Sequence, residues 1–415
     1  MTSDVRDAVV VGGGIAGLSA AWWLRDRDVV VLEAAERLGG RIRSERRGPY
    51  WLNLGAHVFS GPGSATDRLA RELGVELVPV PGALVALEIG GKVVMGGRPE
   101  LYPFRLPFTW RERSALVRRG PKLRRAVARY AALSKPRPGE SAAQTRARVL
   151  AFNDDATFAD WLGPLPGNAD ALIRATVTRS TAEPEELSAG HGAGYFALVW
   201  DSSGGLSRNA IGGSQTLIDA MAAGLEGRVE AGAEVTRVTV EADGLVHVRY
   251  GQDGAERELR ARRAVVATKA YDATRIAPGL PAATRASLEA IPYGGTVVTA
   301  LLTTESGPMP WDGLYALATP ARSFSMLFNM ANVLRPREPV RQPGGSLMVY
   351  RSARAADRLM ELPAEEIERR FVADLCDIYP EAQGIVGETI TLKLPRMLPY
   401  VAPGRARLQP ALEQS

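Results

Sequence analysis

The chain begins with two short apolar runs on either side of a helical stretch. Residues 8–11 and 29–32 are unbroken aliphatic runs, the pattern of strands that are buried on both faces of a parallel sheet. Residues 16–25 between them are rich in alanine and leucine, which favours a helix. The pattern therefore predicts a strand–helix–strand unit, with Glu33 directly after its second strand.

Apolar positions also repeat in the second half of the chain, with the spacing of strands. Residues 296–303 combine β-branched and aliphatic residues as strands do, and apolar side chains alternate from Phe324 to Met330 and along residues 347–350. A period of two places alternate side chains on the same face of a sheet. We therefore expect three strands here, the second of which has one strongly apolar face.

The composition is close to that of an ordinary globular protein. The 415 residues are 46% apolar and 23% charged, and a chain of this length is expected to form about two domains. No apolar run approaches the roughly 20 residues needed to span a bilayer, and the early acids Asp4 and Asp7 do not fit a signal peptide. The single cysteine, Cys376, excludes an internal disulfide and a cysteine metal cluster. We expect a cytoplasmic protein.

The chain carries a formal net charge of +5, and only five of its 51 basic residues are lysines. Because basic residues are not interleaved with aromatic ones as in single-strand binding proteins, we expect no nucleic-acid partner. Arginine is densest along residues 104–135, which predict a basic helical region behind an apolar stretch. A solvated helix face is the simpler interpretation, and peripheral contact with an anionic membrane is the alternative.

A glycine-rich loop joins the first predicted strand to the helix. Gly12, Gly14 and Gly17 fit the pattern G-x-G-x-x-G, in which the first glycine turns the chain out of the strand. The second lets the backbone approach a pyrophosphate, and the third lets the helix pack closely on the strands. Unpaired N–H groups at a helix start attract phosphate, and an acid after the second strand can bind a ribose. The unit therefore predicts a dinucleotide site that includes Glu33.

A second motif follows the acid. Arg37, Gly39, Gly40, Arg41 and Ser44 stand in the order R-x-G-G-R-x-x-[ST]. This order resembles the motif of flavoproteins in the amine oxidase, protoporphyrinogen oxidase and phytoene desaturase superfamily. The resemblance implies FAD rather than NAD, with arginine charge close to the pyrophosphate. It also implies an α/β fold class, in which a Rossmann-like FAD-binding domain joins a substrate domain of mixed sheet and helices.

Further segments resemble the same superfamily in the same order along the chain. Residues 53–57 resemble the D-x-G-A segment that passes the flavin ring, although Asn53 replaces the usual aspartate. Residues 211–220, 234–238 and 264–268 resemble segments that complete the FAD domain. The cofactor-binding residues that the resemblance implies are Gly12, Gly14, Ile15, Ala16, Gly17, Glu33, Ala34, Arg37, Gly39, Gly40, Arg41, Leu54, Gly55, Ala56, His57, Val235 and Ala267.

The resemblance also implies a division of the chain into two domains. The FAD-binding domain would consist of residues 1–72, 205–272 and 390–415, and the substrate domain of residues 73–204 and 273–389. The superfamily's C-terminal flavin segment would begin where the sequence stops, so we expect that segment to be missing. Its covalent flavin cysteine would also come after residue 400, whereas Cys376 lies in an amphipathic helical stretch. We therefore expect non-covalent FAD.

The resemblance implies oxidation by hydride transfer from a substrate C–H bond to the flavin, with O2 or a quinone as electron acceptor. Amine oxidases of the superfamily carry a lysine near the flavin, and the matching position here is Val298. We therefore expect a hydrophobic small-molecule substrate, oxidised as in porphyrinogen oxidation or polyene desaturation. Amine oxidation at a C–N bond is one alternative. An isomerase or mutase that uses reduced flavin, or a non-catalytic escort-type binding protein, is another.

No residue can be assigned to catalysis from the sequence alone. The three histidines, His57, His191 and His247, lie far apart and show no metal-ligand spacing, so we expect no metal site. His57 follows the segment that resembles the flavin contact, and Tyr195 and Tyr350 lie on expected pocket elements. These three residues are the catalytic candidates, although core packing is the simpler interpretation for each.

Overall fold

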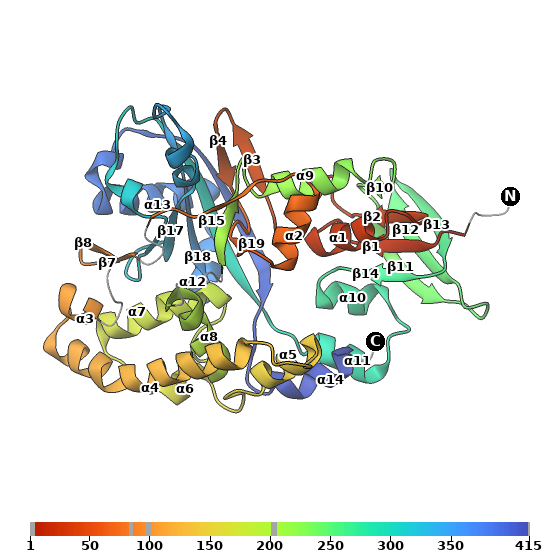
Figure 1. The fold of residues 1–415 in the computed structure, drawn as a ribbon, viewed down its shortest axis with the longest axis horizontal. Helices are drawn as coiled ribbons and strands as arrows, with labels where there is room; N and C mark the ends of the chain where they lie inside the picture. Colours follow the sequence, from red (N-terminus) through yellow and green to blue (C-terminus); the bar gives the residue numbers. More distant parts are fainter. Residues whose placement is uncertain (1–4, 83–85, 97–100, 201–205, 414–415) are drawn as a thin grey trace.

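The computed structural model describes residues 5–82, 86–96, 101–200 and 206–413, and it combines helices with sheets as the predicted fold class requires (Figure 1). The molecule is elongated. A parallel sheet that contains the N-terminal strands lies at one end, and a larger mixed sheet beside a layer of helices lies at the other. None of the described helices is both long and apolar enough to cross a membrane.

The N-terminal sheet has four parallel strands in the order β10–β2–β1–β14. Its strands are β1 (Ala8–Val11), β2 (Val29–Leu32), β10 (Val229–Glu230) and β14 (Ala264–Val266). Helices α1 (Ile15–Trp23) and α9 (Gln215–Ala223) cover one face. An antiparallel sheet covers the other face, with strands β11 (Glu234–Val240), β12 (Val246–Gln252) and β13 (Ala255–Ala261). The predicted strand–helix–strand unit is therefore confirmed.

Burial on both faces explains the unbroken aliphatic runs of β1 and β2. Val10 and Val31 pack with the residues of α1 and α9, whereas Val9 and Val30 pack with those of the antiparallel sheet. All four side chains are buried. A strand between two such layers has no solvent-facing side, so it keeps no polar position.

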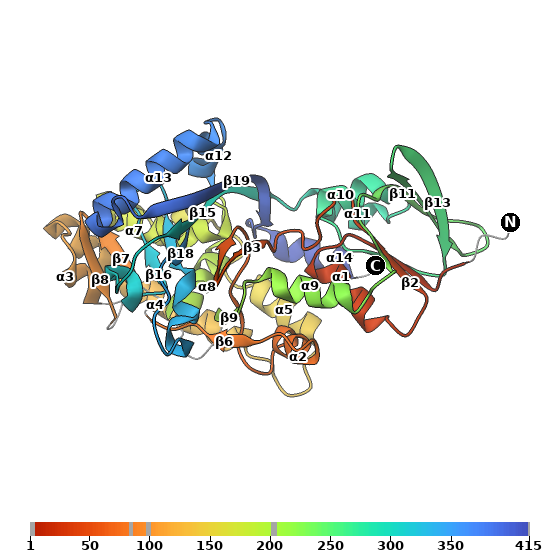
Figure 2. The same ribbon diagram turned by 90° about the horizontal axis from the view of Figure 1, so that it is seen from above.

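The second sheet has seven strands in the order β19–β15–β18–β17–β16–β7–β8. Its strands are β7 (Ala86–Ile89), β8 (Lys92–Met95), β15 (Tyr293–Thr303), β16 (Ala316–Ala318), β17 (Met326–Asn329), β18 (Gly345–Ser352) and β19 (Val386–Pro399). Helices α12 (Arg354–Met360) and α13 (Ala364–Ile378) lie against one face (Figure 2). We call the opposite face, which carries Val298, Met326 and Phe328, the inner face.

Phe324 departs from the predicted alternation. It precedes β17 and packs with Leu327 and Phe371 beneath α13, whereas Met326 and Phe328 belong to the inner face. The predicted common face was wrong for Phe324 but holds for Met326 and Phe328, and both faces of β17 are buried. When both faces are apolar, a period of two does not reveal which side each residue takes.

A layer of helices lies beside the large sheet (Figure 1). Its helices are α3 (Tyr102–Arg105), α4 (Trp110–Ser134), α5 (Ala142–Leu150), α6 (Phe158–Leu162), α7 (Gly167–Val177) and α8 (Ala189–Trp200). The predicted basic helical region is thus confirmed as α3 and α4. Helix α4 begins with a capping box, in which the Glu112 carboxylate accepts the Thr109 N–H at 2.7 Å and Thr109 Oγ1 accepts the Glu112 N–H.

Shorter elements connect the two ends of the molecule or flank them. They are β3 (Ser44–Arg47), β4 (Tyr50–Asn53), β5 (Phe59–Ser60), α2 (Ala65–Glu72), β6 (Leu77–Pro79), β9 (Leu206–Ala210), α10 (Ala270–Ile276), α11 (Ala282–Glu289) and α14 (Gln409–Glu413). Strand β4 contacts β15 and β18 of the large sheet, and β3 pairs with β4. The second glycine motif therefore leads the chain directly from one sheet to the other.

The division of the chain into two domains stays a prediction. Two of its predicted boundaries can be compared with the described residues and strands. The boundary between residues 204 and 205 lies outside the described residues. The boundary at residue 390 falls inside β19, which pairs with β15 in the large sheet. Helix α14 then packs on α11, where the Thr284 hydroxyl donates to the Ala411 carbonyl at 2.9 Å. The C-terminal piece therefore begins as part of the large sheet, through a pairing that no local pattern encodes.

Candidate functional site

The two glycine motifs lie directly against each other. The Gly39 N–H donates to the Gly13 carbonyl at 2.8 Å, and Gly14 and Gly39 form a parallel bridge. Gly39 and Gly40 have φ angles of +107° and +55°, in the region that favours glycine. The second motif therefore forms a wall beside the loop that opens α1.

The glycines of the first motif fall into two groups. A Cβ atom at Gly12 would lie 2.9 Å from the Ala267 carbonyl oxygen, and one at Gly17 would lie 1.9 Å from the Gly12 carbonyl oxygen. Both positions therefore exclude a side chain because the backbone packs too closely. A Cβ atom at Gly14 would meet nothing within 4 Å, so this glycine borders open space.

The start of α1 offers N–H groups beside that open space. The first helical hydrogen bond runs from the Leu18 N–H to the Gly14 carbonyl, so the N–H groups of Ile15, Ala16 and Gly17 precede it. The helix has no side-chain cap and no acid in its first turn. Unpaired donors, a helix dipole and an open approach fit a diphosphate group such as that of FAD.

Glu33 lies at the edge of this loop. Its carboxylate accepts the Gly13 N–H at 2.5 Å and the Ala35 N–H at 2.9 Å, and the residue is half-buried, whereas the neighbouring Ala34 is exposed. Each carboxylate oxygen can accept more than one hydrogen bond, so these contacts orient the acid and leave it acceptor capacity. Its contact with a ribose stays a prediction.

The two arginines of the second motif differ in their partners. Arg37 donates to the backbone carbonyls of Leu38, Gly40 and Ile42 at 2.6–2.9 Å, so its guanidinium braces the loop that contains it. Burial lowers the pKa of Arg37, with the neighbouring charge of Arg43 acting in the same direction. Arg41 is exposed and donates to the Met397 carbonyl at 3.2 Å. Arg41 is therefore the freer of the two for a pyrophosphate.

The end of the second motif is fixed to the start of α9. Ser44 Oγ accepts the Gln215 N–H at 3.0 Å, and a Cβ atom at Gly213 would lie only 2.3 Å from the same oxygen. Asn53 is fully buried, donates to the Gly55 carbonyl at 2.9 Å and accepts from Ser214 Oγ at 3.4 Å. The amide at position 53 therefore ties two segments together where the superfamily has a charge.

The segment after Asn53 runs beside the second glycine motif. The N–H groups of Leu54 and Ala56 donate to the carbonyls of Arg43 and Arg41 at 2.9 and 3.0 Å. A Cβ atom at Gly55 would lie 2.2 Å from the Arg41 carbonyl oxygen, so only glycine fits. Ala56 is exposed although its neighbours Gly55 and His57 are buried, so the segment is accessible at this residue.

Two further predicted cofactor residues, Val235 and Ala267, lie in the N-terminal sheet region. Val235 is buried in β11, and Ala267 follows β14, where its N–H donates to the Val11 carbonyl at 2.8 Å. The carbonyl of Ala267 is also the group that excludes a side chain at Gly12. Their contact with FAD stays a prediction.

His57 is buried and lacks a partner on one nitrogen. Its Nδ1 lies 3.2 Å from the Gly55 carbonyl, which only accepts, so this contact assigns the ring proton to Nδ1. Burial lowers the pKa of His57 to about 4, so the ring is neutral at pH 7. Nε2 has no hydrogen-bond partner among the described residues. Nε2 is therefore a free acceptor, on the residue that directly follows the exposed Ala56.

The structure brings His57 and Tyr350 together through one aromatic ring. The ring of Phe328 lies 4.7 Å from that of His57, edge to face, and stacks on Tyr350 at 5.9 Å. Tyr195 lies on α8, where its ring meets that of His191 edge to face at 5.7 Å. Burial raises the pKa of Tyr195 to about 12 and also raises that of Tyr350. His57 and Tyr350 therefore lie against the same phenylalanine ring, and all three catalytic candidates are neutral at pH 7.

Sequence reasoning missed an arginine at the same place. Arg179 lies on the turn after α7, and this turn contacts β18, the strand that carries Tyr350. Its positive charge also acts on His57 and Tyr195. The signal that could have found it is weak, because arginine is common throughout this chain.

The position that matches the superfamily's lysine lies in a row of residues across the large sheet. Val298 of β15 pairs with Tyr350 of β18, which pairs with Met326 of β17. Met326 pairs with Ala318, and Ala318 pairs with Leu87. Cross-strand partners share a face, so these side chains form one continuous strip on the inner face.

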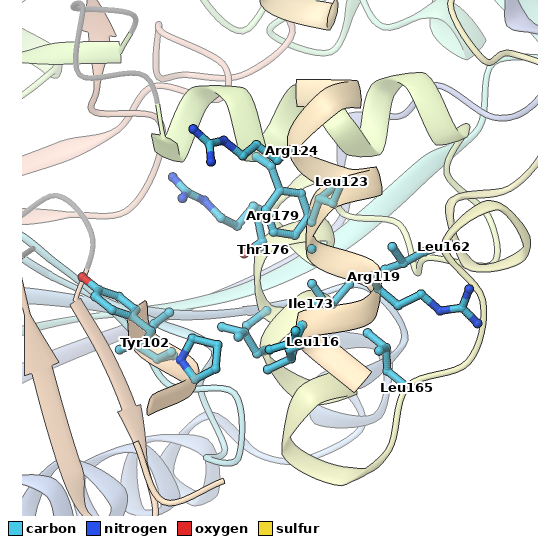
Figure 3. A pocket seen from close by; sticks show the side chains of 18 of the residues that line it. Tyr102, Leu116, Arg119, Leu123, Arg124, Leu162, Leu165, Ile173, Thr176 and Arg179 are labelled. Atoms are coloured by element: carbon cyan, nitrogen blue, oxygen red, sulfur yellow. The ribbon is translucent and has the colours of Figure 1, made fainter. Parts of the chain in front are cut away.

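That strip leads into a cavity of about 360 Å³ between the inner face and the helices (Figure 3). Leu87, Ala318 and Met326 of the strip line it, and α4, α7 and α8 supply the other walls. These walls are mostly apolar and include Leu123, Ile173 and Phe196, which are buried. The cavity therefore adjoins the group formed by His57, Tyr350 and Arg179.

A patch of exposed apolar side chains lies outside this cavity. Leu101, Phe104 and Trp110, on α3 and at the start of α4, are 50%, 60% and 81% exposed. Arg111 and Arg118 of α4 are exposed as well. Apolar side chains among cations suit an anionic membrane surface, and peripheral membrane contact stays a prediction.

Comparison with known proteins places this site in a family. The sequence profile of the flavin containing amine oxidoreductases matches residues 15–393. A flavin-containing amine oxidase of Danio rerio is 28% identical over 261 residues, which are 60% of this chain and 48% of that protein. The coproporphyrinogen III oxidase of Staphylococcus aureus is 35% identical over 75 residues, which are 17% of this chain and 16% of that protein.

A solved structure shares the overall fold. The cyclohexylamine oxidase of Brevibacterium oxydans IH-35A superposes with a TM-score of 0.76 and 22% identity, over 99% of this chain and 91% of that one. The curated relatives are matched over less than half of their own length, as with the two oxidases from Danio rerio and Staphylococcus aureus. The extent of the profile match is decisive: the chain belongs to the flavin containing amine oxidoreductase family.

Proposed function

We propose that this protein is an oxidoreductase that binds FAD non-covalently and removes hydride from a C–H bond of a hydrophobic small molecule. The observation that carries the proposal is the strip of inner-face side chains that runs from Val298 through Tyr350 to Met326 and into the cavity. It connects an apolar binding space to the residues that follow the second glycine motif. Family membership supports the flavin.

The residues around α1 would hold the diphosphate and the sugar of FAD. The N–H groups of Ile15 and Ala16 would bind the pyrophosphate, and Glu33 would accept from the ribose. Arg41 would supply positive charge. The exposed backbone at Ala56 would run beside the ring system. When bound, FAD supplies the hydride acceptor, and O2 or a quinone is the proposed electron acceptor.

The residues of the inner face would orient the substrate and exclude water. Phe328, which is buried, and Tyr350, which is half-buried, supply an aromatic surface, and Val298 adds an apolar one. Nε2 of His57 is a neutral acceptor that can receive a hydrogen bond or a proton from a bound molecule. Hydride removal by a flavin requires no protein nucleophile.

The inner face favours a C–C bond over a C–N bond as the bond oxidised, as in a protoporphyrinogen oxidase or a desaturase. Val298 stands at the position of the superfamily's lysine, so the chain lacks the side chain associated there with amine oxidation. The cavity beyond it carries positive charge at Arg124 and Arg179, which disfavours a protonated amine. Both observations reduce support for an amine substrate.

Amine oxidation is the second candidate. The similarity to a cyclohexylamine oxidase and to flavin-containing amine oxidases favours it. Isomerase, mutase and escort-type functions have no specific observation in their favour.

Anaerobic reduction of the bound flavin tests these alternatives. The purified protein should be yellow, and denaturation should release FAD into the supernatant if attachment is non-covalent. Under anaerobic conditions, polyenes and reduced cyclic polyenes should bleach the flavin, whereas primary amines should not. Bleaching by amines alone would establish the second candidate. A flavin that no substrate reduces would favour a mutase, and a colourless protein would favour the escort-type function.

A further inference from the structure

The charges in the cavity are all of one sign. Among the described residues that line it, the charged side chains are Arg119, Arg124 and Arg179, and none of the lining residues is an aspartate or a glutamate. In Figure 3, Arg124 and Arg179 extend toward the same side, and Arg119 extends toward the other. An apolar space with positive charge suits a ligand that combines an apolar body with a negative group.

Arg179 is the charge best placed to select such a ligand. It is half-buried, whereas Arg124 is exposed. The turn that carries it, Thr178–Ser180, is held against the large sheet, because the Thr181 hydroxyl lies 3.2 Å from the Leu398 carbonyl of β19 and donates to it. A Cβ atom at Gly294 of β15 would lie 1.8 Å from the Thr181 carbonyl oxygen, so the turn and the sheet are in close contact. The backbone therefore presents Arg179 from a rigid position.

Arg179 has no acidic partner in the described part of the chain, because no carboxylate there lies within 4.0 Å of its guanidinium. Three other half-buried arginines are paired with acids. Arg148 contacts Glu140 at 2.5 Å, Arg322 contacts Glu88 at 3.1 Å, and Arg335 contacts Glu338 at 3.0 Å, with 13–15% of each arginine side chain exposed. Arg179 therefore differs from these three arginines, because its positive charge has no counter-charge among the described residues.

The groups around Arg179 do not neutralise it either. Tyr350 and Tyr195 are protonated at neutral pH because burial raises their pKa values, and His57 is neutral because burial lowers its pKa to about 4. A guanidinium among neutral groups in a low-dielectric space attracts an anion strongly. Its planar donors match the two oxygens of a carboxylate better than a single donor would.

We propose that the cavity binds a carboxylic acid with an apolar body, and that Arg179 binds its carboxylate. The apolar body would lie against Leu123, Ile173 and Phe196. The inference rests on the proposed function, because the cavity adjoins the surface at which hydride removal is proposed. It narrows the substrate class from hydrophobic molecules to hydrophobic acids, and it assigns Arg179 as the residue that determines this specificity.

Calorimetric titration of the FAD-loaded protein with octanoate, octanol and octylamine tests the proposal. The three probes share one apolar chain and differ only in the charge of their polar end. Octanoate should bind about tenfold or more tightly than the other two, because a hydrogen-bonded ion pair in a dry site is worth about 1.5–3 kcal/mol. Equal affinity for octanol, tighter binding of octylamine or no binding of octanoate would overturn the proposal.

Two substitutions at Arg179 and one matched control locate the effect. Arg179→Gln should remove the preference for octanoate while leaving the affinity for octanol unchanged, and Arg179→Lys should restore part of the preference. Arg118→Gln, which removes an exposed charge from α4 outside the cavity, should change neither. An equal loss of affinity for all three probes in Arg179→Gln would contradict the assignment.

Flavin absorbance, measured separately, tests the proposed function. Selective octanoate binding by a protein that lacks FAD would reject the proposed function and retain the proposed carboxylate site.

Discussion

Two regions of the molecule differ in the sequence distance between the residues that meet. One is the loop around Gly14, which we call the nucleotide end after its proposed ligand, and the other is the inner face with its cavity, which we call the substrate end. Around Gly14, the neighbouring groups Glu33 and Gly39 come from the same short stretch of chain. On the inner face, by contrast, Val298 and Tyr350 come from different strands, and Arg179 comes from the helical layer. A motif can indicate a cofactor when the residues that hold it are neighbours in sequence. A pocket assembled by long-range pairing leaves no comparable local pattern.

The largest loss of stability is expected at the nucleotide end, at the glycine where the backbone packs most closely. Gly17→Ala places a Cβ atom 1.9 Å from the Gly12 carbonyl oxygen, so the helix must move away from the loop. We expect a loss of about 3 kcal/mol or more in the free energy of unfolding. Chemical denaturation measures it. Wild-type stability in this variant would show that the helix and the loop are not in close contact.

Gly14→Val separates cofactor binding from folding at the same loop. The position borders open space, and its φ of −76° and ψ of 175° suit any residue, so the fold should be retained. The valine side chain would occupy the space that a diphosphate needs. We expect the affinity for FAD to fall about 100-fold, which corresponds to about 2.8 kcal/mol of binding free energy. Flavin absorbance after gel filtration reports the loss. A variant that keeps FAD at wild-type stoichiometry would refute the proposed placement of the diphosphate.

Two buried histidines predict that the protein loses stability at acidic pH. Burial lowers the pKa values of His57 and His191 to about 4, below the value of about 6.5 in an unfolded chain. The unfolded state therefore binds more protons between these values, so stability is complete above pH 6.5 and falls as the pH drops toward 4. We expect a loss of about 2 kcal/mol per histidine between pH 7 and pH 5.

Denaturation midpoints at pH 7 and pH 5 measure that loss. His57→Asn should remove the share of His57 and leave the share of His191. The acids whose pKa values are lowered, such as Glu140, contribute only below this window, because their stability is lost as the pH falls below about 4.5. A wild-type protein with the same stability at both pH values would show that these rings are accessible to water.

Glu33→Gln is expected to have the smallest effect of the series. The amide keeps one acceptor oxygen but loses the charge that holds the Gly13 N–H at 2.5 Å. We expect FAD to bind about tenfold more weakly, since a hydrogen bond to a charged group is worth about 1.5 kcal/mol more than none. Equilibrium dialysis measures the affinity. Unchanged affinity would remove Glu33 from the ribose site while leaving the diphosphate site intact.

Predictions from the sequence succeeded where the physical cause was local. The strands at residues 8–11 and 29–32 follow from continuous apolar runs, and the close packing at Gly17 follows from the glycine pattern. They failed where the pattern of apolar residues is compatible with either face of a strand. Phe324 was expected on the same face as Met326, but both faces of β17 are buried and the two residues lie on opposite sides.

The sequence by itself determined the N-terminal unit, its open helix start and the basic character of α4, because each depends on residues that are close along the chain. Only the tertiary structure decided that β19 continues the large sheet and that His57, Tyr350 and Arg179 meet beside an apolar cavity. Strand pairing and layer packing bring together residues more than a hundred positions apart. Their free energy depends on shape and burial in the folded molecule, which no single stretch of sequence contains.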